Sequence, residues 1–197
     1  MKKTHVLMPF HVALILCCFF GCASTKIESI TKSGTNLCYY NNILIYCNFD
    51  NLQYRKQLET EFQKQFSKNN IQSIKSIDLF PPLKEYSPSE INAITASSGA
   101  ALFLEVKILS LYTNKGDNNY FFFIPYDGFI FGSGSSEIKL TVDFDITIRD
   151  TTSGEILLRG TATAEDENDS LSKCLKYIFE SLSIELVKKY FITNTNS

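Results

Sequence analysis

The chain has 197 residues, with 19 Lys or Arg side chains, 21 Asp or Glu side chains and a formal net charge of −2. A chain of this length can bury its own core, and its basic residues are scattered singly, which disfavours a general nucleic-acid-binding role. Its two histidines, His5 and His11, lie near the amino terminus. The rest of the chain therefore has no Ser-His or Cys-His nucleophile pair and no histidine-bearing zinc site.

The first residues have the pattern of an export signal. Lys2 and Lys3 precede an almost wholly apolar run over residues 6–20. A run of this length falls short of the roughly 20 residues that a membrane-spanning helix needs. The pattern therefore predicts a signal peptide over residues 1–21, which is removed on export.

Gly21-Cys22 resembles the lipobox of bacterial lipoproteins, in which signal peptidase cuts before the cysteine and the thiol carries a diacylglycerol. Phe19 and Phe20 stand where that family prefers Leu and then Ala or Ser. The resemblance implies a covalent lipid on Cys22 and no other cofactor. The alternative is a soluble exported protein that is cut nearby, for example after Ala23.

Removal of residues 1–21 takes away Lys2 and Lys3, which leaves 17 basic and 21 acidic side chains and a charge of −4. No Asp follows Cys22 directly, which favours a protein held in the outer membrane and facing the periplasm over one retained at the inner membrane. The inner membrane and the cell surface stay open as alternatives within the cell envelope.

Three further cysteines follow Cys22. In an oxidising periplasm Cys38 and Cys47 can form a disulfide across a short loop, whereas Cys174 lies in a predicted helix and has the character of a small buried apolar residue. No two cysteines have the spacing of metal ligands, so no metal site is expected.

After the cysteine, residues 22–36 are polar without a sustained period and are predicted to be a tether. A single domain is expected over residues 37–192, and residues 193–197 form a polar tail. The domain begins with a strand over residues 43–49. Asp50 is expected to cap the next helix, whose apolar side chains recur at four-residue spacing: Leu58, Phe62 and Phe66.

A second strand is predicted over residues 71–79, and Pro81-Pro82 ends it. Ser87-Pro88-Ser89-Glu90 is a capping box that starts the next helix. That helix is expected to end near Gly99 and a strand to follow over residues 101–111. Its inward-facing residues are expected to be Ile91, Ala93 and Ile94.

Residues 137–149 alternate apolar and polar, and residues 155–165 return after a turn, which predicts an antiparallel hairpin with one buried face. The inward residues of the return strand are expected to be Ile156, Leu158, Ala162 and Ala164. A long amphipathic helix is predicted over residues 170–191. The fold class is thus α+β: a two-layer sandwich in the order β-α-β-α-β-β-β with a C-terminal helix, its mixed sheet covered by helices on one face.

This order resembles a superfamily of bacterial envelope proteins through residues 90–106 and 142–160. Its members are the TolB amino-terminal domain, the curli-secretion lipoprotein and the lipoprotein activators of penicillin-binding proteins. The resemblance implies a non-enzymatic envelope role. Two features depart from it. The tether of about 15 residues reaches only roughly 50 Å, whereas the activators of penicillin-binding proteins have a long tether that crosses the cell-wall mesh. The hairpin arms within 120–131 are shorter than the 9–11 residues of a spanning strand, whereas the curli-secretion lipoprotein inserts long hairpins into the outer membrane.

Residues 115–137 form an insertion that this fold does not require, and they are predicted to be an aromatic hairpin. An exposed aromatic patch marks a contact with a partner or membrane, and the alternative is an edge hairpin packed over its own sheet. The contact residues are expected to be Tyr120, Phe121, Phe122, Phe123, Tyr126, Phe129 and Phe131.

The main functional hypothesis is a membrane-anchored lipoprotein that docks onto an envelope protein as an assembly or transport accessory, with a homo-oligomer left open. A small-molecule or lipid carrier is the alternative, and a carboxylate-based hydrolase ranks last. Asp143 and Asp145 share a face with Lys139, Thr147 and Arg149, which favours a solvated surface over a catalytic pair.

Overall fold

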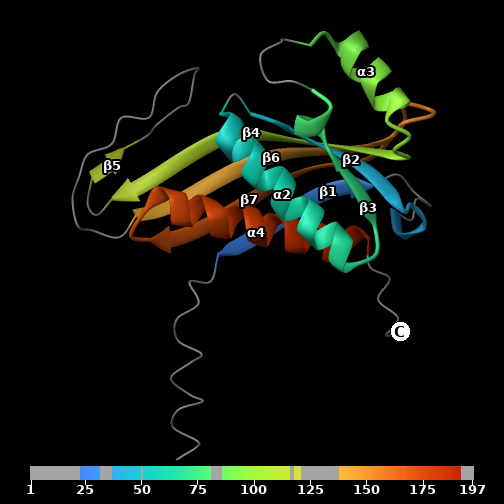
Figure 1. Cartoon of the computed structure of the whole chain (residues 1–197). Coiled ribbons are helices and arrows are strands. Elements are labelled where there is room, and N and C mark those ends of the chain that lie inside the picture. The colour runs from blue at the N-terminus through green and yellow to red at the C-terminus, as the bar shows by residue number, and fades with distance from the viewer. Residues whose placement is uncertain are drawn as a thin grey trace, which may run out of the picture.

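The computed structural model describes residues 23–31, 37–49, 51–80, 86–115, 118–120 and 138–191. In these residues two long helices lie across one face of a twisted sheet (Figure 1). The signal peptide, Cys22 and residues 121–137 lie outside the described residues. The elements in chain order are β1 (Ser24–Thr31), η2 (Leu37–Tyr39), β2 (Asn42–Asn48), α2 (Leu52–Lys68), β3 (Gln72–Lys75), η3 (Ser76–Asp78), α3 (Pro88–Ser97), β4 (Leu102–Lys115), β5 (Asn118–Tyr120), β6 (Ile138–Asp150), β7 (Ile156–Asn168) and α4 (Leu171–Tyr190).

The sheet is mixed, with the strand order β1-β7-β6-β4-β2-β3 and the short β5 paired to the end of β4. Strand β2 runs parallel to β3 and to β4, whereas β4, β6, β7 and β1 form an antiparallel series. The parallel pair β2-β3 needs a crossover, and α2 provides it. This arrangement confirms the α+β fold class and the predicted element order.

One face of the sheet packs against α2 and α4 and forms the main core. Alternate residues of the central strands point to this face, among them Ile45 and Phe144, and both are completely buried. The predicted helical stripes supply the other side of the core. Its completely buried helix residues include Leu58, Phe62, Phe66, Cys174, Leu175, Ile178, Leu182 and Leu186.

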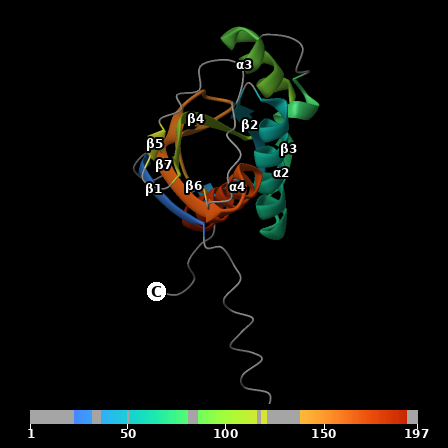
Figure 2. The same cartoon turned by 90° about the vertical axis from the view of Figure 1, so that its left-hand side faces the viewer.

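Helix α3 lies outside the layer made by α2 and α4 (Figures 1 and 2). The predicted capping box at its start is confirmed. The Ser87 side chain accepts a hydrogen bond from the Glu90 backbone N–H, and the Glu90 side chain accepts one from the Ser87 backbone N–H. Its Ile91 and Ile94 pack against a second, smaller cluster that contains Leu44 and Phe103. The prediction that Ala93 also points inward is wrong, because its side chain is exposed.

The predicted tether over residues 22–36 is wrong in its first half, because Ser24–Thr31 form the edge strand β1. This strand pairs antiparallel with β7, from Ser24 opposite Glu165 to Thr31 opposite Leu158. Among the described side chains of the segment, Ile27 is the apolar residue that packs against the main core. The pairing is thus made by backbone hydrogen bonds, which leave little trace in the sequence.

Two smaller corrections concern the ends of predicted elements. Asn51, rather than Asp50, caps α2, since its side chain accepts the backbone N–H groups of Gln53 and Tyr54. The predicted strand over residues 71–79 ends at Lys75 and continues as η3.

The return strand β7 departs from strict alternation near its start. The pairing of β6 with β7 shifts between Ile148 and Arg149. Such a bulge adds one residue to one strand and turns the following side chains over. Leu157 is buried as a result, and the predicted inward residue Ile156 is half exposed.

Candidate functional site

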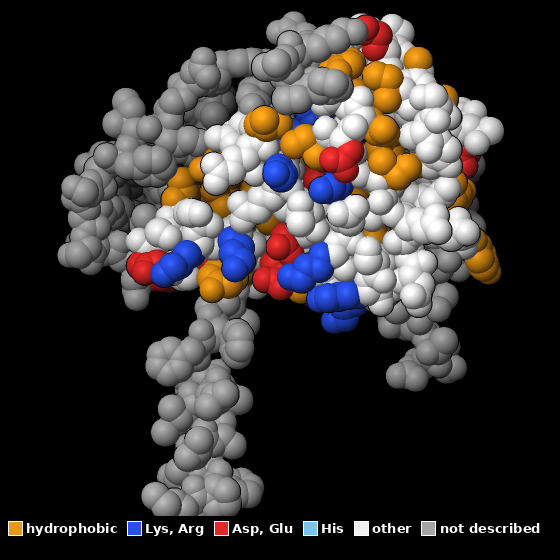
Figure 3. All heavy atoms as spheres, viewed as in Figure 1, with side chains coloured by type: hydrophobic (Ala, Val, Ile, Leu, Met, Phe, Trp, Pro, Cys, Tyr) orange, Lys and Arg blue, Asp and Glu red, His pale blue; other side chains and the backbone are white. Residues whose placement is uncertain are grey.

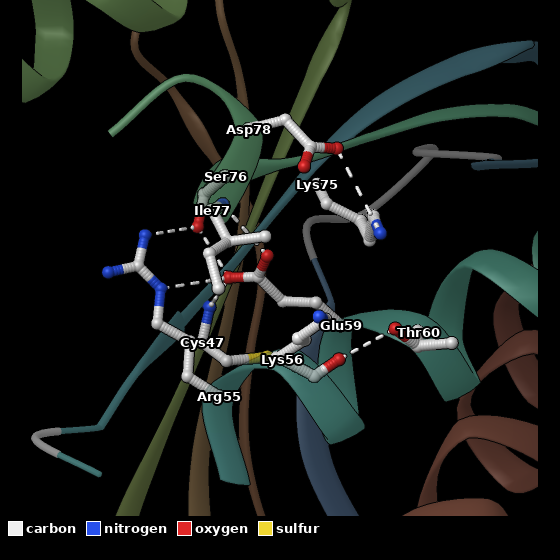
Figure 4. A network of polar contacts seen from close by, with 9 residues as sticks. All are labelled: Cys47, Arg55, Lys56, Glu59, Thr60, Lys75, Ser76, Ile77 and Asp78. Atoms are coloured by element: carbon white, nitrogen blue, oxygen red, sulfur yellow. Dashed lines mark hydrogen bonds and ion pairs between the residues drawn. The ribbon is translucent and has the colours of Figure 1, made fainter. Parts of the chain in front are cut away.

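A buried carboxylate, Glu59 of α2, lies at the centre of a polar network (Figure 4). Its Oε1 accepts hydrogen bonds from Arg55 Nε at 3.1 Å, Ser76 Oγ at 2.5 Å and the Cys47 backbone N–H at 3.2 Å. Its Oε2 accepts from the Ile77 backbone N–H at 3.0 Å. We call these five residues the Glu59 clamp.

The clamp joins three elements: α2, the end of β2 and η3. Arg55 strengthens it by donating to Ser76 Oγ at 2.8 Å and by lying over the Tyr46 ring at 5.2 Å. Glu59 is completely buried and both of its oxygens accept hydrogen bonds from neighbouring elements, so its carboxylate is out of reach of a substrate. The clamp therefore holds the helical layer to the sheet and is a poor candidate for a reactive site.

Cys47, whose backbone N–H belongs to the clamp, is one of the two predicted disulfide partners. Cys47 is a free, completely buried thiol, and burial together with the nearby Glu59 charge raises its pKa well above the usual value. This does not agree with the disulfide predicted between Cys38 and Cys47. Cys47 lies on the core side of β2, two residues beyond the buried Ile45, which faces it away from the surface. The Cys38 side chain lies outside the described residues.

The opposite face of β4, β6 and β7, which α2 and α4 leave uncovered, carries polar side chains in cross-strand pairs. We call it the open face. Asp143 accepts from Ser110 Oγ at 2.5 Å and from Thr163 Oγ1 at 2.7 Å. Arg149 donates to Glu105 at 2.9 Å. Asp143 thus has its oxygens engaged by neighbouring strands, as is typical of a polar sheet surface.

A shallow hollow of about 460 Å³ lies at the β1 side of the open face. The residues that line it are polar or charged and come from the edge strand β1 and from β7, including Ser24, Lys26, Glu28, Thr161, Thr163 and Glu165. A carrier for an apolar ligand needs an enclosed apolar cavity. This hollow does not have that character, so it gives the carrier hypothesis no support.

The helical side of the molecule has a different charge character. Lys and Arg side chains gather along its lower part, over α4 and the adjoining end of α2, with acidic side chains between them (Figure 3). Together α2 and α4 contain eight basic and four acidic residues. Positive charge is therefore concentrated on this side of a chain that is acidic as a whole.

The start of β1 and the residue before it are fixed to the middle of α4. Ser181 Oγ donates to the Ala23 carbonyl at 3.3 Å and accepts from Thr25 Oγ1 at 2.8 Å. Further along, Lys189 Nζ donates to the Ile27 carbonyl at 2.8 Å. The start of β1 lies against α4 in both cartoon views (Figures 1 and 2). Nothing in the pattern of the α4 sequence identifies Ser181 as this contact.

The predicted lipid site Cys22 and most of the predicted aromatic contact residues lie outside the described residues. Tyr120 is the last residue of β5, opposite Thr113 of β4. Strand β6 begins at Ile138, opposite Asn168 of β7. Tyr120 and Ile138, which flank residues 121–137, therefore lie at the end of the sheet at which β1 begins, because Ser24 pairs with Glu165 nearby.

Within the part of the chain that the structure describes, no helix is long and apolar enough to cross a membrane. Over the same residues, no group of three or more His, Cys, Asp or Glu side chains is arranged to hold a metal ion.

No protein-family model and no curated protein matches the chain. Among solved structures it is similar to the PelC dodecamer from Paraburkholderia phytofirmans, with 12% identity over 87% of this chain and 100% of that one, and a TM-score of 0.48. It is also similar to lipoprotein GNA1162 from Neisseria meningitidis (13% identity, 75% and 98% covered, TM-score 0.42) and to a minor lipoprotein from Acinetobacter baumannii (10%, 76% and 91%, 0.40). Likenesses at this level assign neither a family nor an activity, and the resemblance to the TolB amino-terminal domain stays a prediction.

One further carboxyl group is buried without good partners. Asp166 of β7 is 4% exposed, and neither oxygen meets a well-aligned donor among the described residues. Burial raises the pKa of Asp166, and the weak donors Cys174 and the Glu167 backbone N–H only partly oppose this. Burial and the nearby Asp166 in turn raise the pKa of the Cys174 thiol to about 12.

We expect Glu59→Ala to lower the free energy of unfolding by about 3–5 kcal/mol, because it removes the charge that pairs with Arg55 and leaves the backbone N–H groups of Cys47 and Ile77 without their acceptor. Urea unfolding of the purified mature protein measures this. Glu28→Gln is the control, since Glu28 is an exposed residue whose ion pair with Lys26 is screened by solvent and contributes little to stability. A similar small loss for both variants would show that the clamp does not secure the fold.

We expect Asp166→Asn to change how stability depends on pH. The folded state binds the Asp166 proton more tightly than the unfolded state does, so wild-type stability falls as pH rises from the ordinary Asp pKa through the raised one. The variant should lack this fall and be more stable than the wild type at pH 7, because a neutral amide costs less to bury than a carboxylate. Thermal unfolding from pH 3 to 8 measures the difference, and a constant difference across that range would contradict the assignment.

Proposed function

We propose that the protein is a lipid-anchored component of the bacterial cell envelope that docks onto another envelope protein without catalysing a reaction. The observation that carries the proposal is the position of β1. This strand starts at Ser24, two residues after Cys22, and Ala23 is hydrogen-bonded to α4. Cleavage before Cys22 would therefore leave the described body whole and place the new amino terminus at its surface.

Three features support a docking role over an enzymatic one. The chain beyond His11 has no histidine. Glu59 and Asp143 use their oxygens in hydrogen bonds to the framework. The aromatic segment, residues 120–131, has a composition typical of contact surfaces, and the described residues Tyr120 and Ile138 lie at the end of the sheet at which β1 begins.

The proposed location is the outer membrane, with the body facing the periplasm. The proposed partner is an envelope protein or, in a homo-oligomer, a second copy of the chain. Crosslinking in native envelopes, followed by mass spectrometry of the captured chains, separates these two partners.

We expect Cys22→Ser to abolish the incorporation of radiolabelled palmitate, because the thiol that carries the lipid is removed. The variant should also accumulate as an uncleaved precursor. Cys38→Ser is the control and should be labelled as strongly as the wild type. Equal labelling of the wild type and Cys22→Ser would refute the anchor.

We expect the double variant Phe122→Ser, Phe129→Ser to lose its crosslinked partner while keeping the wild-type melting temperature, because these rings serve contact and not the core. The control is Tyr39→Ser, which removes an aromatic ring that is 84% exposed elsewhere on the body. A large fall in melting temperature for the double variant would instead mean that the aromatic segment packs on its own sheet.

A further inference from the structure

The position of α4 beside the amino end restricts how an anchored body can lie. One peptide unit, about 3.8 Å between Cα atoms, separates Cys22 from Ala23. Ala23 is itself hydrogen-bonded to Ser181 in the middle of α4. This step rests on the lipid anchor proposed above: acyl chains on Cys22 lie in a bilayer, so the part of α4 around Ser181 lies at the level of the lipid headgroups.

The solvent side of α4 next to Ser181 is not a plain polar surface. Tyr177 and Ile184 lie four residues before and three residues after Ser181, so they are its neighbours on the helix surface. Ile184 is 38% exposed. Five residues on this side form a surface that we call the α4 stripe. Four of them recur at four-residue spacing and Tyr177 adjoins the first: Lys176, Tyr177, Glu180, Ile184 and Lys188.

The two lysines of the stripe have no acidic partner among the described residues. Lys176 lies only over the ring of the adjacent Tyr177, at 6.0 Å. The stripe's one acid, Glu180, faces Lys64 of α2 at 3.7 Å. Lys188 and Lys176 therefore present uncompensated positive charge on either side of an exposed apolar residue.

This charge runs against the composition of the whole chain. The helices α2 and α4 carry eight basic and four acidic residues, which leaves nine basic and seventeen acidic among the other residues after 21. The open face, on the other side of the sheet, carries both signs, with Lys107, Lys139 and Arg149 among acids such as Glu105 and Glu165. An anionic surface is therefore attracted more strongly to the helical side than to the open face.

We propose that the α4 stripe docks onto anionic phospholipid headgroups of the same leaflet that holds the lipid on Cys22. Lys176 and Lys188 contact the phosphates, while Ile184 and Tyr177 enter the interface beside them, as in amphipathic helices that lie on membranes. The docked body turns the open face away from the bilayer. That face is then free to meet a partner.

The test uses the lipidated mature protein in two kinds of vesicle, pure phosphatidylcholine and phosphatidylcholine with phosphatidylglycerol. A short pulse of an amine-acetylating reagent, read by mass spectrometry, gives the reactivity of each lysine. We expect Lys176 and Lys188 to react about fivefold more slowly on the anionic vesicles, and high salt to remove the difference. Lys107 and Lys139 of the open face are internal controls and should react equally on both.

A charge variant checks the cause. Lys173, three residues before Lys176 on α4, should also react more slowly on anionic vesicles in the wild type. Lys176→Gln, Lys188→Gln should remove that protection of Lys173, whereas Lys107→Gln, Lys139→Gln should leave it. Acyl mass on residue 22 and flotation with vesicles report the anchor separately. A protein that is acylated and floats but whose α4 lysines react equally on both vesicles overturns the docking and leaves the anchor standing. Slower reaction at Lys107 and Lys139, or protection that depends only on protein concentration, also overturns it.

Discussion

Burial of one face of the sheet beneath α2 and α4 is the constraint on which the other features depend. Phe62, Phe144 and Phe179 are completely buried between the two layers, where each ring removes a large apolar area from water. The Glu59 clamp fixes α2 to β2 and η3 at the edge of this interface. Because the helices occupy one side, the charged residues of β4, β6 and β7 are left on the other. The same division leaves an excess of positive charge on the helical side and a mixture of acidic and basic groups on the open face.

Much of this architecture can be predicted from the sequence, because its period is strong where the core is made. The alternation in residues 137–149 and the stripe of α4 each follow from one buried face, and the Ser87 box marks the start of α3. Edge strand β1 has no such signal. Its pairing depends on backbone hydrogen bonds to β7 and on the Thr25–Ser181 contact, more than 150 positions apart, and neither can be read from local pattern.

The site is less predictable than the fold. Two cysteines nine positions apart favour a disulfide in an oxidising compartment, but strand register faces Cys47 into the core, and register is set by tertiary pairing. Alternation alone decides the side of the sheet on which Asp143 lies, and the structure has a polar surface there. The lysines of α4 fit the ordinary pattern of a solvated helix face. They suggest a membrane-facing surface only because Ala23 lies beside Ser181, and that contact is visible only in the three-dimensional structure.

The strand β1 changes what an anchored protein of this kind can reach. A flexible segment of about 15 residues would allow the body to move roughly 50 Å from the bilayer. With residues 24–31 built into the sheet and Ala23 held by Ser181, only the link at Cys22 remains between lipid and body. Under the proposed anchoring the body therefore lies on the membrane surface in a restricted orientation. Its partners must accordingly lie at that surface as well, because a partner across the cell-wall mesh would be out of reach.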